Sequence, residues 1–381
     1  MQIIYTTDEL RELCSRLKTQ DFVAVDFEFV REKSYYSIPC LIQVANEEEA
    51  ALIDPLAPDI DLTPFWEIMK NPDITKVFHS CRQDVEIIYN MTGSIPLPLF
   101  DTQLVAMVCG FGESVGYEKL VKSILKISID KSECLSNWQM RPLNEKQLEY
   151  ACGDVTHLVK IYKYLKRKVE RNKRMEWLQE EMDILCDPKT YYVEPSEAWL
   201  RIKLRTHNNK VLSRLKALCE WRELRAQKRN TPRQSLIKDD VLVTIAIANP
   251  QTLQDLENIR GIRKEQTVGK FAEEILETVA NAKIYRNMKR PGEEIIKASP
   301  SLVEMLKMLL RIISQKNAAV PRIIAHETDL QHFAAKEDDK TNFLTGWRFE
   351  VFGKHALKLR NGKLSIRYNP ETKGVDFVEL D

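Results

Sequence analysis

The 381-residue sequence lacks the features that would place it in a membrane or send it out of the cell. No apolar run approaches the roughly 18–20 residues that span a bilayer. The first residues contain no basic stretch followed by an apolar one, so no secretory signal is expected. These absences predict a cytoplasmic protein with no membrane partner.

The common motifs for zinc, disulfides and nucleotides are missing as well. The eight cysteines all lie in the first 220 residues and form no CxxC pair, which argues against a zinc site and a disulfide scaffold. The six histidines show no HExxH or other paired-ligand spacing, and structural or surface roles are favoured for them. No GxxxxGK[ST] loop is present, so no nucleotide cofactor is expected.

What the chain does have is an uneven distribution of charge. Its 44% apolar and 30% charged residues are typical of globular proteins, and its length predicts two or three domains. Residues 1–150 carry a net charge of −10 and residues 151–381 a net charge of +11, with 12 basic and 4 acidic residues between 201 and 250. This division indicates one part that gathers cations and another that meets a polyanion. The alternative is that the basic helices are merely solvated.

The first third of the sequence mixes strands and helices. The segment Thr6-Thr7-Asp8-Glu9 has capping-box spacing and predicts a helix through Leu17. Sequential short strands with brief connections favour an antiparallel meander, and they are expected at Asp21–Val30, Cys40–Ala45 and Ala50–Ile53. Later, an apolar stripe at helical spacing predicts a long helix over Glu145–Lys168.

A proline-containing break at Cys186–Glu197 predicts a domain boundary, and the remainder reads almost wholly as helix. This region holds a weak internal repeat, in which Thr231-Pro232-Arg233 corresponds to Val320-Pro321-Arg322 at a distance of 89 residues. We interpret it as two related helical modules, although chance agreement would also account for it.

The strand Val23–Val30 carries the most chemical information. Side chains alternate along a strand, so Asp26 and Glu28 share one face while Phe27 lies on the other. Two carboxylates this close repel each other and lose hydration, and a bound divalent cation offsets both costs. The alternative is an edge strand with one wetted face.

Three further residues gain meaning only together with that strand. Asp84 follows a predicted short strand at the start of a helix, where an acidic residue is usually explained by the helix dipole. Tyr150 and Asp154 stand four apart on the predicted long helix and therefore share a face. Taken singly, a surface tyrosine beside a solvated aspartate is the simpler interpretation.

The combined pattern resembles the DEDD exonuclease superfamily, and Tyr150 four residues before Asp154 resembles its Tyr-type subclass. The neighbouring sequence is similar to RNase D, although Phe27 stands between Asp26 and Glu28 where a small residue is expected. The segments that carry this similarity are Asp26–Glu32, Cys40–Ala45, Phe100–Gln103, Asp130–Ser132, Trp138–Leu143 and Tyr150–Asp154. The resemblance implies an α/β ribonuclease H-like exonuclease domain, with a mixed sheet flanked by helices, followed by two all-α HRDC-type helical domains. We expect these domains at residues 1–200, 206–288 and 295–381, the last being divergent.

The resemblance also implies a function, namely 3′→5′ exoribonuclease activity that releases nucleoside 5′-monophosphates. Two divalent ions, Mg²⁺ or Mn²⁺, are expected at Asp26, Glu28, Asp84 and Asp154, with Tyr150 orienting the attacking water. RNA is the expected partner, and tRNA precursors and other 3′-extended structured RNAs are the first candidates. The alternatives are a DNA-trimming exonuclease and a catalytically idle nucleic-acid-binding protein.

Overall fold

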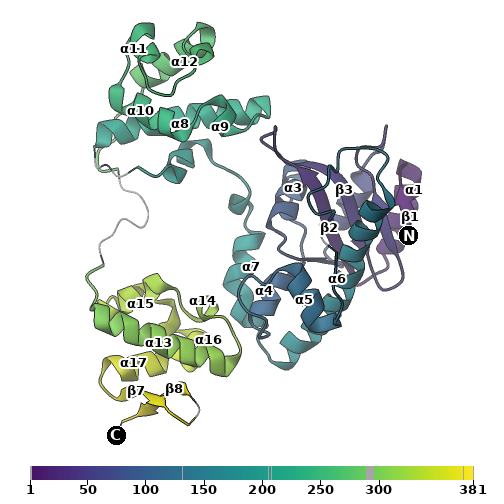
Figure 1. Ribbon diagram of the computed structural model, residues 1–381, viewed down its shortest axis with the longest axis vertical. Helices are drawn as coiled ribbons and strands as arrows, with labels where there is room; N and C mark the ends of the chain where they lie inside the picture. The colour runs from purple at the N-terminus through teal and green to yellow at the C-terminus, as the bar shows by residue number, and fades with distance from the viewer. Residues whose placement is uncertain are drawn as a thin grey trace.

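The computed structural model describes residues 2–130, 132–204, 206, 208–288, 296–371 and 373–380. Some features considered in the sequence therefore lie outside the described residues, namely Lys131 within the Asp130–Ser132 motif, Arg205, His207 and the start of the last predicted domain at 295. Figure 1 shows three units: a sheet covered by helices, a helical unit in the middle of the chain and a C-terminal unit. Among the described residues, no helix combines the length and apolar character needed to cross a bilayer.

The N-terminal unit is built on a six-stranded sheet with the order β1-β4-β3-β2-β5-β6. β2, β3 and β4 pair antiparallel, which confirms the predicted meander, whereas β1, β5 and β6 join the sheet in parallel. The strands are β1 (Gln2–Ile4), β2 (Phe22–Val30), β3 (Ile38–Ala45), β4 (Ala50–Ile53), β5 (Thr75–Phe78) and β6 (Leu99–Asp101).

Helices cover both faces of this sheet because its central strand is apolar on both sides. Val23, Val25 and Phe27 pack into a core with α1 (Thr7–Leu17), α2 (Thr63–Lys70) and α3 (Arg82–Thr92). Ala24 faces the opposite core, which contains α4 (Thr102–Met107), α5 (Tyr117–Leu125) and α6 (Glu145–Arg171). The predicted alternation along β2 is thus confirmed, and Asp26 and Glu28 lie on the side of α6.

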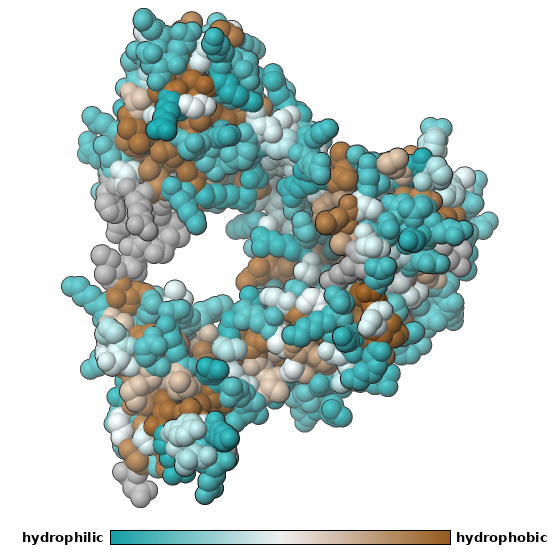
Figure 2. All heavy atoms as spheres, viewed as in Figure 1, coloured by the Kyte–Doolittle hydropathy of each residue, from teal (hydrophilic) through white to brown (hydrophobic). Residues whose placement is uncertain are grey.

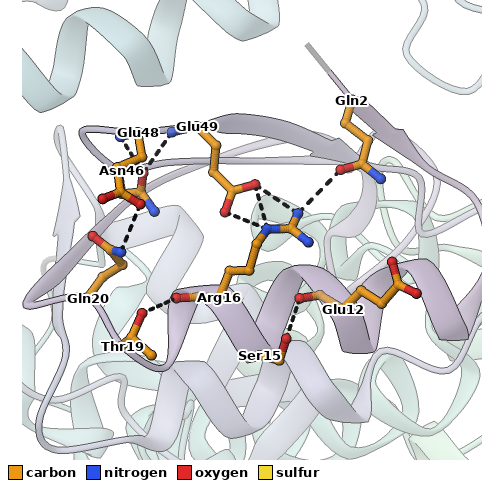
Figure 3. A network of polar contacts seen from close by, with 9 residues as sticks. All are labelled: Gln2, Glu12, Ser15, Arg16, Thr19, Gln20, Asn46, Glu48 and Glu49. Carbon is orange, nitrogen blue, oxygen red and sulfur yellow. Dashed lines mark hydrogen bonds and ion pairs between the residues drawn. The ribbon is translucent and has the colours of Figure 1, made fainter.

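Polar contacts join α1 to the turn between β3 and β4, as Figure 3 shows. Thr6 and Glu9 form the predicted capping box at the start of α1. Arg16 near the end of α1 forms an ion pair of 2.8 Å with Glu49. Glu49 belongs to the turn between β3 and β4, where the Asn46 side chain accepts hydrogen bonds from two backbone amides. The helix and the strand turn are therefore held together independently of the carboxylates on β2.

The middle unit begins before its first long helix. After η1 (Met175–Leu178), α7 (Gln179–Cys186) and η2 (Pro188–Thr190), the short helix η3 (Pro195–Arg201) packs its Ala198 and Trp199 into the core of this unit. The remaining elements are α8 (Asn209–Arg229), α9 (Arg233–Leu236), α10 (Asp239–Ala248), α11 (Leu253–Glu257), η4 (Lys264–Gln266) and α12 (Gly269–Ala280).

The C-terminal unit is helical as expected, with one addition that the all-α prediction lacked. It ends in an antiparallel hairpin of β7 (Leu364–Asn369) and β8 (Gly374–Glu379), whose Leu364 and Phe377 pack toward the helices. Its other elements are α13 (Pro300–Asn317), α14 (Pro321–Ile324), α15 (Glu327–Ala334), η5 (Asp338–Lys340), η6 (Asn342–Leu344), α16 (Gly346–Arg348), η7 (Phe349–Gly353) and α17 (Lys354–Arg360).

The internal repeat appears in the structure as a repeated turn. In both helical units a long helix ends at a left-handed residue, Asn230 (φ 46°) or Ala318 (φ 47°), and a four-residue helix follows. Both turns contact the N-terminal unit. The Asn230 side chain accepts hydrogen bonds of 3.0 Å from the amides of Tyr35 and Tyr36.

The second turn uses a backbone contact instead. The Val320 amide donates to the Met107 carbonyl at 3.1 Å, and Trp347 stacks on Trp177 with ring centroids 4.3 Å apart. With both helical units held in this way, the three units border an opening in the molecular surface (Figure 2).

Candidate active site

Three of the predicted site carboxylates meet where α6 crosses β2. Asp26 and Glu28 project from the strand and Asp154 from the helix, and each offers an oxygen atom within 4.8 Å of those of the other two. β2 places its two carboxylates a pleat apart, and α6 is held against the sheet by buried side chains such as Val155 and Leu158. The strand and helix patterns in the sequence are therefore what bring these groups together.

Asp84 lies beside this cluster on the first turn of α3. Asp84 is only 6% exposed to solvent. Burial, followed by the charge of Asp26, raises the pKa of Asp84 well above its usual range. The turn that carries it is held by Asp101, whose carboxylate accepts hydrogen bonds from the amides of Ser80 and Cys81 at 3.2 and 2.9 Å. Asp101 thus fixes the start of α3 and the position of Asp84.

The electrostatics of the cluster suit a divalent cation. Burial raises the pKa of Asp26 to about 7. Burial first, and then the neighbouring carboxylates, raise the pKa of Glu28 to about 9. Both shifts mean that negative charge is unfavourable here without a counterion. The donors are all carboxylate oxygens, which hard ions such as Mg²⁺ and Mn²⁺ prefer.

Tyr150 lies one helical turn before Asp154 and next to it. Burial raises the pKa of Tyr150, and the charge of Asp154 together with a hydrogen bond between the two side chains raises it further. The phenol therefore stays protonated at neutral pH. A second tyrosine, Tyr117 on α5, donates a hydrogen bond from its hydroxyl group to the Asp154 backbone carbonyl and so supports α6 at this point.

A pocket of about 230 Å³ opens over the carboxylates. Its walls combine acidic, aromatic and aliphatic side chains, so that it can receive both a charged and an apolar part of a ligand. They are Asp26, His79, Tyr117, Ile129, Cys134, Tyr150, Asp154 and Leu158. Tyr117, Ile129, Cys134 and Leu158 were not predicted as site residues. No local sequence signal marks the first three, whereas Leu158 lies four residues after Asp154 on α6, a spacing that could have indicated it.

His79 lines this pocket, whereas Phe27 lies away from it. The Nδ1 atom of His79 is 3.0 Å from the Thr102 hydroxyl, and burial lowers the pKa of this histidine. Phe27 packs on the far side of β2, with its ring centroid 6.2 Å from that of Phe65. The departure from the family pattern at Phe27 therefore does not intrude on the carboxylates.

The basic stretch of the middle unit does not form one free face. Arg222 pairs with Asp239 at 2.7 Å, and Arg225 pairs with Glu274. Arg233 pairs with Glu223 at 2.7 Å, so several charges of the stretch stabilise the unit itself. Other members remain exposed, namely Arg201, Lys203, Lys210, Lys228 and Arg229, whereas Arg205 lies outside the described residues.

Comparison with known families agrees with this architecture. Residues 1–170 match the 3′-5′ exonuclease family, and residues 211–279 match the HRDC domain family. Ribonuclease D of Zymomonas mobilis is 41% identical over 385 residues, covering 100% of this chain and 99% of its own length. Ribonuclease D of Granulibacter bethesdensis is 40% identical over 369 residues, covering 96% of this chain and 93% of its own.

The likeness extends to solved structures. The crystal structure of Escherichia coli RNase D, described as an exoribonuclease involved in structured RNA processing, superimposes with a TM-score of 0.78 at 28% identity. That match covers 95% of this chain and 98% of the other. A protein from Bifidobacterium adolescentis shares the fold, with a TM-score of 0.68 at 19% identity.

Proposed function

The chain belongs to the ribonuclease D family and is a 3′-5′ exoribonuclease, and we propose that it hydrolyses RNA with two divalent metal ions bound by four carboxylates. These are Asp26, Glu28, Asp84 and Asp154. The observation that carries the proposal is the meeting of three carboxylates within 4.8 Å, with the fourth buried beside them.

The roles of the side chains follow from their chemistry. When bound, Mg²⁺ or Mn²⁺ would lower the pKa of the attacking water and neutralise charge on the leaving 3′ oxygen. Asp26, Glu28 and Asp154 are suited to one ion, and Asp26 with Asp84 to the other. The protonated Tyr150 hydroxyl is a hydrogen-bond donor rather than a general base, so it positions the water or the scissile phosphate.

The products are nucleoside 5′-monophosphates, released one at a time from a 3′ end. tRNA precursors and other structured RNAs with 3′ extensions are the substrates that we propose. Support comes from the E. coli relative, which is described as acting in structured RNA processing. We propose that the chain forms three domains, at residues 1–200, 206–288 and 295–381. The Ala198 and Trp199 side chains in the middle core favour placing its start slightly earlier.

The test is shortening of a 3′-extended tRNA precursor by the purified full-length protein, with Mg²⁺, with Mn²⁺ and with EDTA. We expect removal of the extension only with metal, and faster turnover than on a DNA strand of the same sequence. Equal or faster trimming of the DNA would assign the protein to the DNA-trimming class. No turnover on either strand would leave it a binding protein.

A further inference from the structure

A second cavity, distinct from the carboxylate pocket, lies between the N-terminal and middle units. Its volume is about 500 Å³. One wall is the loop after β2 together with α3, another is the segment from Thr190 to Ile202, and the third is formed by α8, α9 and the start of α10. Five arginines and three acidic residues line it: Arg31, Arg82, Arg201, Arg222, Arg233, Glu86, Glu223 and Asp239.

Three of the five arginines are neutralised within the wall. Arg31 pairs with Glu86 at 3.0 Å. The pairs Arg222–Asp239 and Arg233–Glu223, described above, bring the remaining two acidic residues into the same framework. Arg222 and Glu223 are buried, so their ion pairs stabilise the wall of the cavity and are not free to bind a ligand.

Arg82 and Arg201 are different. Both are exposed, and neither forms an ion pair with any residue in the described part of the chain. They approach the cavity from two units, Arg82 from the first turn of α3 and Arg201 from the end of η3. The cavity therefore has an excess of two positive charges, both guanidinium groups, whose planar donor geometry matches phosphate oxygens.

The position of the cavity relates it to the carboxylates. Arg82 precedes Asp84 by two residues on α3, and residues so spaced point to nearly opposite sides of a helix. An α-helix with side chains is about 10–12 Å across, so the thickness of α3 separates the Arg82 and Asp84 side chains by a distance of this order. A strand whose 3′ end is at the carboxylates can extend its upstream phosphates to this distance.

We propose that this cavity is a phosphate-binding site for the RNA strand upstream of the 3′ end, with Arg82 and Arg201 as its contact groups. The proposal rests on the function proposed above and deepens it. It assigns the RNA contact to two arginines at the junction of two units, of which only Arg201 belongs to the basic stretch of the middle unit. Because both contacts are to phosphate, they add affinity without sequence preference.

The test measures binding by the full-length chain carrying Asp26→Asn, so that the RNA is not consumed. One probe is a labelled single-stranded RNA long enough to reach the cavity, and the other is a dinucleotide too short to reach it. Arg82→Ala and Arg201→Ala are each expected to weaken binding of the long RNA about two- to fivefold. Each is also expected to reduce the slope of log affinity against log salt by about 0.7, and the double variant by about 1.4.

Arg171→Ala is the matched control, because Arg171 is an exposed arginine at the far end of α6. An unchanged salt slope in the double variant, or an equal loss in the control, overturns the proposal. Competition by inorganic phosphate as strong as that by RNA would also overturn it, since the site would then be a general anion site. Failure of the proposed function is distinguishable, because the protein without Asp26→Asn would then not shorten RNA at all.

Discussion

Negative charge at Asp26, Glu28 and Asp84 is unfavourable until a cation binds, because burial raises the pKa of each of these carboxyl groups. Asp26→Asn or Asp154→Asn is expected to lower RNA turnover by orders of magnitude while the protein stays folded. Removing one of several mutually repelling carboxylates should also raise the melting temperature of the metal-free protein. Thermal unfolding in EDTA checks the second expectation, and a lower melting temperature for both variants would contradict it.

The same residues predict a pH dependence of stability. Their pKa values of about 7 for Asp26 and about 9 for Glu28 lie above the ordinary carboxyl values, so the folded state binds more protons than the unfolded state. The metal-free protein should therefore lose stability as the pH rises from about 4 to about 9. Saturating Mg²⁺ should flatten this profile, because metal binding requires the ionised carboxylates. Unfolding measured across this range, with and without metal, decides the point.

Tyr150 offers a separate test of positioning. Tyr150→Phe keeps the ring and removes the hydroxyl, so it should reduce kcat and leave KM for RNA nearly unchanged. Tyr164→Phe, on the same helix but 42% exposed, is the control and should change neither. If Tyr150→Phe has the kcat of the unaltered protein, Tyr150 is only a packing residue.

The periodicities of strands and helices were sufficient to predict how most of the site residues lie relative to one another. Alternation placed Asp26 and Glu28 on one face of β2, and four-residue spacing placed Tyr150 beside Asp154 on α6. Tyr117 could not be predicted, because its contact with Asp154 joins residues 37 apart in sequence. The β7–β8 hairpin was missed because two short strands after a helix give a weak signal. Its stability comes from packing against α13 and α17 and from ion pairs with them, such as Lys358–Glu379 at 2.6 Å.

The repeated turns are elements whose role can be measured. Asn230→Gly preserves the left-handed conformation but removes the acceptor for the Tyr35 and Tyr36 amides. Loss of two such bonds should cost about 1–3 kcal/mol of docking free energy and speed hydrogen exchange at both amides. Asn249→Gly is the control, since Asn249 also ends a helix in the left-handed region. Equal exchange in the two variants would mean that Asn230 does not hold the units together.

The net charge of each half of the chain predicts only part of the arrangement of charges in the folded molecule. It separates the acidic residues 1–150 from the basic residues 151–381, although Asp154 of the carboxylate cluster lies in the basic part. It also does not show that Arg222, Arg225 and Arg233 are used in internal ion pairs. Such pairing depends on the tertiary positions of Asp239, Glu274 and Glu223, which a count of charges ignores. The opening bordered by three units (Figure 2) likewise results from the docking of both repeated turns, which no local pattern indicates.

The carboxylates on β2 and α6 are proposed to carry metal-dependent hydrolysis from the 3′ end. The most direct measurement follows a 5′-labelled RNA under single-turnover conditions with the unaltered protein, with Asp26→Asn and with Asp21→Asn. Asp21 is an exposed aspartate just before the same strand and serves as the control. We expect a ladder of products shortened from the 3′ end, abolished by EDTA and by Asp26→Asn but not by Asp21→Asn. Undiminished shortening by Asp26→Asn in Mg²⁺ would mean that these carboxylates do not carry the hydrolysis.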